Sequence, residues 1–205
     1  MRVSKKQSET NRGSLLQAAG RLFNEKGFDG VGVAEVAKEA GLTHGALYAH
    51  FPSKDALAAE AFSDGIAHRL KSMRRRKRTF EEYLDAMFSI EHRDNLANGC
   101  PMTASASEIS RQGAAVATSF AQAFQETVAV LEESIGGDIP ASERRHLAVS
   151  ALTAQIGAMA VARGVAKVAP SLSKEVLRIV RETVTPSSQA TGNEARRTLL
   201  PHPSK

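Results

Sequence analysis

Hydrophobic residues recur every three or four positions along most of this chain, which is the spacing of one face of an α-helix. The first such run begins near Thr10, and others extend from Ser53 to about Met73 and from Val116 to Ile135. We find no convincing strand, because no segment alternates apolar and polar residues in the manner of a half-buried strand. The pattern therefore predicts an all-α protein.

Two short helices are predicted between residues 33 and 50. The first carries an apolar stripe that ends just before Gly41, a residue that readily adopts the left-handed conformation ending a helix. Thr43 can then cap a second helix, from His44 to about His50, and Ser53 can cap the long helix that follows Pro52. Two short helices joined by a tight turn form a helix-turn-helix, whose second helix fits the major groove of DNA.

The segment GLTHGALYAHFPSKDAL, which follows VAEVAKEAG, resembles the DNA-binding signature of TetR-family transcriptional regulators. The resemblance extends from Leu15 to Glu60, and beyond residue 65 it is one of architecture only. It implies an N-terminal three-helix DNA-binding domain followed by a helical domain for ligand binding and dimerisation. We accordingly expect a disordered basic arm (1–9), a helix-turn-helix domain (10–54), a helical body (55–185) and a disordered tail (186–205).

The resemblance also implies which residues contact DNA. Thr43, His44 and Gly45 begin the second helix of the motif, and Tyr48 lies one turn further on the same face. His50 and Lys54 match family positions that touch phosphates, and Val33, at the start of the first helix of the motif, is included with them. The alternative for Tyr48 and His50 is that they only pack against the domain. Leu47 and Phe51 are expected in the core.

Charge and composition narrow the class of protein. The net charge of the 205 residues is +5, and residues 66–78 carry seven basic side chains and no acidic one. The run from Arg74 to Arg78 either attracts DNA phosphates or is a solvated helix end that favours the helix dipole. With one cysteine no intrachain disulfide can form, and we recognise neither a signal peptide nor an apolar run of membrane-spanning length, so a cytoplasmic protein is expected.

The middle of the chain is expected to hold a small, hydrophobic effector. The resemblance implies a repressor that leaves its operator when such a molecule enters a pocket among the middle helices. Candidates for this pocket are apolar residues with a cysteine: Tyr83, Met87, Phe88, Cys100, Met102, Phe120 and Phe124. The same residues serve equally well as core. A DNA-binding protein without any ligand is a further alternative.

Cys100 is predicted at the N-terminus of a helix that begins with Pro101, where the helix dipole favours the reactive thiolate. A sensor of oxidants or electrophiles that binds DNA and uses Cys100 is therefore an alternative, beside an inert, half-buried thiol. The histidines and the cysteine show no metal-ligand spacing, and no phosphate loop or catalytic dyad is visible. We expect no metal, no cofactor and no enzymatic activity.

The resemblance implies a homodimer formed by the last two helices, near 141–168 and 173–185. The first of these carries a stripe of small residues to which another helix can approach closely: Ala151, Ala154, Ala158, Val161, Ala162 and Val165. The alternative is that this stripe packs only within its own subunit. A two-fold dimer presents two recognition helices to DNA half-sites about one helical turn apart.

Overall fold

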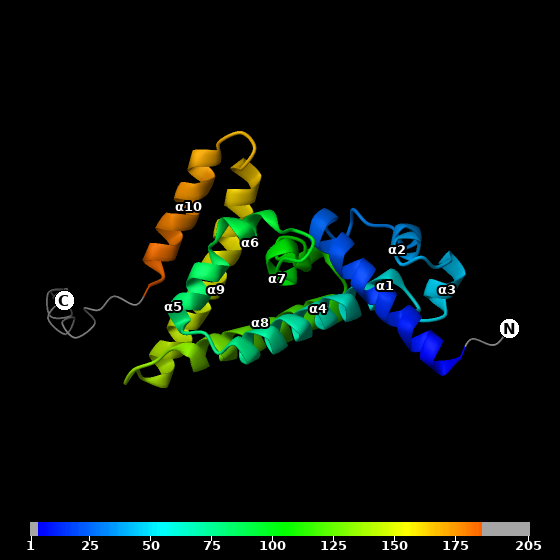
Figure 1. Ribbon diagram of the computed structural model, residues 1–205, viewed down its shortest axis with the longest axis horizontal. Helices are drawn as coiled ribbons and strands as arrows, with labels where there is room; N and C mark the ends of the chain where they lie inside the picture. The colour runs from blue at the N-terminus through cyan, green and yellow to red at the C-terminus, as the bar shows by residue number, and fades with distance from the viewer. Residues whose placement is uncertain (1–3, 186–205) are drawn as a thin grey trace, which may run out of the picture.

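The computed structural model describes residues 4–185, and over this range the protein is all-α, as predicted (Figure 1). No strand occurs within these residues. The elements are α1 (Lys5–Lys26), α2 (Val33–Glu39), α3 (His44–Tyr48), α4 (Lys54–Arg76), α5 (Phe80–Met87), α6 (Ile90–Asp94), α7 (Pro101–Ser105), the 3-10 turn η1 (Ile109–Arg111), α8 (Ala114–Ser134), α9 (Ala141–Val165) and α10 (Pro170–Thr183).

Helices α1, α2 and α3 form a small domain at one end of the molecule, here called the head (Figure 1). Its core consists of buried apolar residues from all three helices, among them Leu15, Phe23, Val36 and Leu47. Helix α1 begins at Lys5, earlier than predicted, because the Ser4 side chain accepts a hydrogen bond from the Gln7 backbone N–H at 3.2 Å. Residues 5–9 are therefore helical rather than a disordered arm, and residues 1–3 lie outside the described range.

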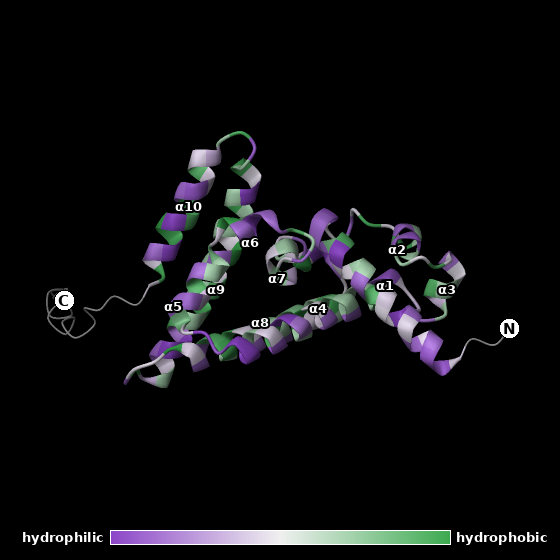
Figure 2. Ribbon diagram, viewed as in Figure 1, coloured by the Kyte–Doolittle hydropathy of each residue, from purple (hydrophilic) through white to green (hydrophobic). Residues whose placement is uncertain are grey.

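Helix α4 connects the head to the remaining helices, here called the body (α5–α10). It packs on α1 at its beginning and along α8 over much of its length, and the two helices run side by side in Figure 1. Helices α9 and α10 pack on each other at the end of the molecule away from the head. Figure 2 shows α4, α8 and α10 banded in hydrophobic and hydrophilic colours, as expected for amphipathic helices that bury one face.

Several helices end at residues other than those predicted. Helix α5 ends at Met87 instead of Glu91, because the Ser89 side chain caps a new short helix by accepting a hydrogen bond from the His92 N–H at 3.0 Å. Helix α9 ends at Val165 rather than 168. The predicted tail, 186–205, lies outside the described residues.

Helix α9 is long and apolar enough, by length and composition alone, to cross a membrane. One such helix is weak evidence for a span, because the core helices of soluble proteins meet the same criterion. Here one face of α9 is buried against α8, α10 and α7.

Candidate functional site

The helix-turn-helix forms where the sequence predicts it, and hydrogen bonds between residues close in sequence cap its helices. Gly41 has a φ of +69°, the left-handed conformation that ends α2, and Leu42 N–H returns to the carbonyl of Ala37 at 2.8 Å. The Thr43 hydroxyl accepts a hydrogen bond from Ala46 N–H at 3.2 Å and starts α3. Ser53 caps α4 in the same way, through Ala56 N–H at 3.1 Å. Each of these roles is confirmed.

The predicted DNA-contacting residues of α3 lie on an open face of the head. Thr43, His44, Gly45 and Tyr48 are exposed, and the Tyr48 side chain keeps 47% of its surface accessible. The rings of His44 and Tyr48 meet edge to face with centroids 5.1 Å apart, so the two side chains support each other. An exposed aromatic and an exposed imidazole beside a helix N-terminus can donate hydrogen bonds to phosphates or base edges.

The other three candidates are only partly exposed. Val33 packs against the hydrophobic core, and His50 and Lys54 are half-buried at the junction of α3 with α4. Leu47 and Phe51 are fully buried, as predicted. Arg12 of α1 lies over the Phe51 ring, 5.1 Å from its centroid, and forms an ion pair with Glu60 of α4. These contacts fix the start of α4 against the head.

The basic run lies far from the recognition helix. Arg74, Arg75 and Arg76 form the last turn of α4, and Lys77 ends the helix in a left-handed conformation with φ of 45°. A 23-residue helix is about 35 Å long, so the run is separated from α3 by the length of α4. This placement favours the interpretation as a solvated helix end over contact with the DNA bound by the same head.

Three hydrogen bonds join the head to the body, and the sequence analysis predicts none of them. The Glu108 carboxylate accepts a hydrogen bond from Phe28 N–H at 2.7 Å, just after α1 ends. The Asn24 side chain donates to the carbonyl of Ala97 at 3.2 Å, and Gln112 donates to Asp29 at 3.3 Å. All three partners in the body belong to the segment from Ala97 to Gln112, which contains α7 and η1.

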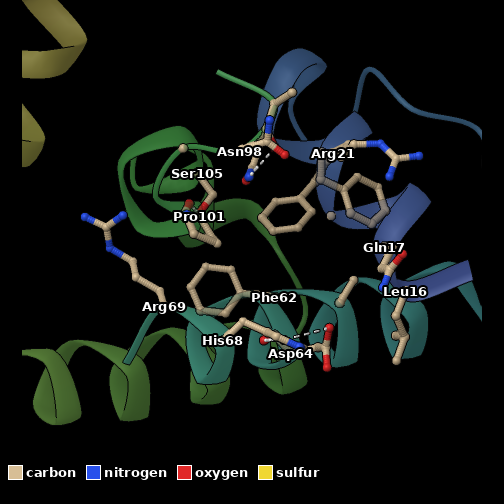
Figure 3. A pocket seen from close by; sticks show the side chains of 18 of the residues that line it. Leu16, Gln17, Arg21, Phe62, Asp64, His68, Arg69, Asn98, Pro101 and Ser105 are labelled. Atoms are coloured by element: carbon tan, nitrogen blue, oxygen red, sulfur yellow. Dashed lines mark hydrogen bonds and ion pairs between the residues drawn. The ribbon is translucent and has the colours of Figure 1, made fainter. Parts of the chain in front are cut away.

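Two cavities open along α4, and they meet at Arg69, Ser72 and Asn98. The head-side cavity, of about 510 Å³, lies between α1, α4 and α7, and Phe23, Phe28 and Phe62 contribute to its wall. Figure 3 shows Phe62 and Pro101 inside it, with Arg21 and Arg69 at opposite ends. The body-side cavity, of about 640 Å³, lies between α4, α5 and α6. Both volumes are in the range of small-molecule sites.

The seven predicted effector residues do not meet in one cavity. Tyr83 and Met87 line the body-side cavity, and the Tyr83 hydroxyl donates to the Met73 carbonyl at 2.8 Å. Phe88 lines a smaller hollow with residues of α10. Cys100 and Met102 are buried, and Phe120 and Phe124 pack at the edge of the core, the former against Phe62. The spacing along the chain identified core residues more reliably than cavity walls.

Cys100 is the N-cap residue of α7, as predicted, and it retains only 2% of its surface accessible. An oxidant or electrophile in solution cannot reach this thiol without a local opening of the body. The geometry therefore does not favour Cys100 as a sensor. No group of three or more His, Cys, Asp or Glu side chains suited to a metal occurs in residues 4–185.

The small-residue stripe on α9 is largely internal. Ala151, Ala158 and Ala162 are buried within the subunit, Ala154 and Val165 are half-buried, and Val161 is 51% exposed. The exposed side of α9 carries other small residues, including Gly157 and Gly164, where an added Cβ would meet nothing within 4 Å. On α10, Leu172 and Ile179 are 46% and 45% exposed. The subunit thus leaves apolar surface on both helices that were predicted to form a dimer.

Comparison with known proteins supports the assignment of the helix-turn-helix in the head. Residues 15–61 match the family model described as "Bacterial regulatory proteins, tetR family". The regulator AcrR of Shigella flexneri is 39% identical over 59 residues, which are 29% of this chain and 27% of AcrR. The regulator LmrA of Bacillus subtilis is 44% identical over 55 residues, or 26% of this chain and 29% of LmrA. The chain thus aligns with less than a third of the length of these relatives.

Structural similarity extends over most of the chain. A TetR-family transcriptional regulator from Cytophaga hutchinsonii superposes with a TM-score of 0.67, covering 90% of this chain and 96% of that one at 19% identity. At this identity the likeness concerns the fold alone. The fold is that of an N-terminal helix-turn-helix domain joined to a helical C-terminal domain.

Proposed function

We propose that this chain, whose residues 15–61 match the TetR family model, acts as a homodimeric transcriptional repressor that releases its operator when a small effector binds. The observation that carries this proposal is the exposed face of α3, where Thr43, His44, Gly45 and Tyr48 stand free beside a capped helix N-terminus. Such a face is the part of a helix-turn-helix that enters the major groove. Lys54 and His50 flank it and are proposed to hold phosphates.

Selection of binding sites from genomic DNA by the purified full-length chain tests the DNA-binding part of the proposal. Sites that emerge should bind with a steep salt dependence, because phosphate contacts release counterions. Replacing both Tyr48 and Lys54 by Ala should weaken binding and lower the salt slope by about 1 for the lost lysine contact. Lys71→Ala, at an exposed position of α4 far from α3, is the matched control. Recovery of no enriched site would overturn the regulator assignment.

The dimer is proposed to form through α9 and α10. Leu172, Val176 and Ile179 recur at helical spacing on α10, and two of them are nearly half exposed. Covering such a face with a second copy removes apolar surface from water. Sedimentation equilibrium should show a dimer that Ile179→Asp dissociates and Leu96→Asp, at an exposed apolar position in the loop before α7, leaves intact. A dimer unaffected by Ile179→Asp would place the interface elsewhere.

The effector is proposed to enter through the body-side cavity, beside Tyr83 and Met87, and to reach the point where this cavity meets the head-side cavity. The test compares wild-type protein with Tyr83→Ala and measures, in each, how far an effector releases a selected operator.

A further inference from the structure

Arg69 occupies the point where the two cavities meet. It contributes to the walls of both the head-side and the body-side cavity, and its side chain is half-buried. Within residues 4–185 no carboxylate forms an ion pair with it, in contrast to Arg12, Arg21, Arg93 and Arg181. Figure 3 shows the guanidinium at the end of the head-side cavity away from Arg21. A half-buried guanidinium without a counter-ion has unused capacity for two parallel hydrogen bonds.

His92 presents a second unused group at the same place. It lines the body-side cavity, and its Nε2 atom is buried without a hydrogen-bond partner in the described part of the chain. Burial, with Arg69 and Arg163 nearby, lowers the pKa of His92 to about 4. The imidazole is therefore neutral near pH 7, and with its proton on Nε2 it can donate one hydrogen bond.

The acidic residues of the body-side cavity are mostly engaged. Glu82 accepts hydrogen bonds from the backbone and hydroxyl of Thr79 in a capping box, and Asp85 accepts two from Arg181. Glu91 is exposed at the rim. Of the groups that line this cavity, Arg69 is therefore a positive charge without an ion pair and His92 a donor without a partner.

The head-side cavity supplies the opposite chemistry. Phe23 and Phe28 come from the head, Phe62 and Ala61 from α4, and Pro101 from α7, so part of the wall is apolar and aromatic. Of the charged residues that also line it, Arg21 pairs with Glu39 and Asp64 with His68. A cavity with an unpaired guanidinium at one end and three phenyl rings beyond it is complementary to a molecule with an anionic end and an apolar body. The planar guanidinium matches a carboxylate, which accepts two parallel hydrogen bonds from it.

We propose that the effector is a carboxylate with a short apolar or aromatic body, bound between α1, α4 and α7 with its carboxylate on Arg69, at the junction with the cavity that His92 lines. This site deepens the proposed function and rests on it for its regulatory meaning. It differs from the pocket expected from the sequence, because its apolar wall includes Phe23 and Phe28 of the DNA-binding head. A molecule bound there touches the head and the body at once.

Isothermal titration of the full-length protein, without DNA, tests the site with a defined probe series. The series runs from phenylacetate to 6-phenylhexanoate, each compared with its neutral primary amide. We expect at least one carboxylate to bind, and its amide to bind at least about tenfold more weakly, since hydrogen bonds to charged groups contribute roughly twice as much as neutral ones. Arg69→Gln should weaken the carboxylate by about tenfold or more and leave the amide nearly unchanged, while Arg75→Gln, on the exposed side of the same helix, should change neither.

A second pair of variants locates the apolar body of the probe. Gly20 lines the head-side cavity, and a Cβ at this position would meet nothing within 4 Å, so Gly20→Leu starts its side chain in open space and extends it into the cavity. Gly13 has equally open surroundings two turns earlier on α1 but does not line the cavity. Gly20→Leu should abolish carboxylate binding, and Gly13→Leu should preserve it.

Three results would overturn the inference: no carboxylate of the series binding at millimolar concentration, equal affinity for acids and amides, or binding that survives Arg69→Gln and Gly20→Leu. Each is read on DNA-free protein, so it is separable from the proposed function. Protein that fails here but selects an operator remains a regulator with a different effector. Protein that binds carboxylates as expected but selects no operator retains the site and loses the repressor assignment.

Discussion

Removing the Glu108 carboxylate should loosen the head from the body. Glu108 accepts the hydrogen bond of Phe28 N–H at 2.7 Å, directly after the turn in which Gly27 adopts a φ of +75°. The body thus holds the end of α1 through a charged acceptor. In Glu108→Ala the Phe28 N–H loses that acceptor at a partly buried position, which costs about 1.5–3 kcal/mol for a hydrogen bond to a charged group.

Hydrogen exchange followed by mass spectrometry or NMR measures this loss locally. If the opening of the α1 end is governed by this bond, exchange of the Phe28 amide should accelerate by about 10- to 150-fold in Glu108→Ala. Glu108→Gln keeps a neutral acceptor and should give a smaller acceleration. Glu126→Ala, which removes an exposed carboxylate on α8, should leave the Phe28 amide unchanged.

The reasoning also predicts a functional consequence. A head held less firmly should bind its operator with a larger entropic penalty, and an effector should change its affinity for DNA less. Unchanged protection of the Phe28 amide in Glu108→Ala would refute the view that this carboxylate connects the two domains. Equal acceleration in the Gln and Ala variants would show that the negative charge, which both variants lack, carries the effect, because Gln keeps the shape and a neutral acceptor.

Three further predictions concern single residues. The folded protein holds His92 neutral down to its pKa of about 4, whereas His92 in the unfolded chain takes up a proton near pH 6.5. Lowering the pH through this window should therefore reduce the unfolding free energy of wild type by up to about 3 kcal/mol relative to that of His92→Gln. Urea denaturation at each pH measures the difference. Thr43→Ala should lower the unfolding free energy by about 1 kcal/mol, because α3 loses its cap, and it should also weaken operator binding. Gly20→Ala should raise the unfolding free energy by up to about 1 kcal/mol, because the site has room and α1 gains helix propensity; a lowered melting temperature would show that the added methyl group is not accommodated.

The parts of this protein that the sequence predicts well are those determined by neighbours along the chain. Thr43 and Ser53 cap their helices through residues three positions away, and Gly41 ends α2 through its own backbone freedom. Residues 33–54 form a helix-turn-helix for these local reasons, and the same stretch carries the family signature. The exposure of Tyr48 follows as well, because Leu47 and Phe51 occupy the buried face of the same short helix.

The parts it predicts poorly depend on contacts between distant segments. Glu108 meets Phe28 across 80 positions, and nothing in either local sequence marks the pair. Arg69 lies in the segment 66–78, which carries seven basic side chains, and the sequence does not distinguish it from the basic residues at the solvated end of the helix. Only the fold separates it from Arg75 and places it between two cavities. Effector residues chosen for their hydrophobicity were divided among core, cavity and surface hollow for the same reason.

The position of the head-side cavity bears on how binding can control DNA affinity. A ligand shifts a conformational equilibrium only by the difference between its affinities for the two states, and a tenfold difference corresponds to about 1.4 kcal/mol. A cavity enclosed by α4, α5 and α6 keeps its shape when the head rotates, unless α4 itself moves. The head-side cavity has α1 as one wall, so any rotation of the head against α4 changes its volume and the distance between Phe23 and Arg69. A molecule that fits one orientation therefore discriminates against the other directly, and a rotation of the head has to strain or break the hydrogen bonds of Asn24 and Glu108.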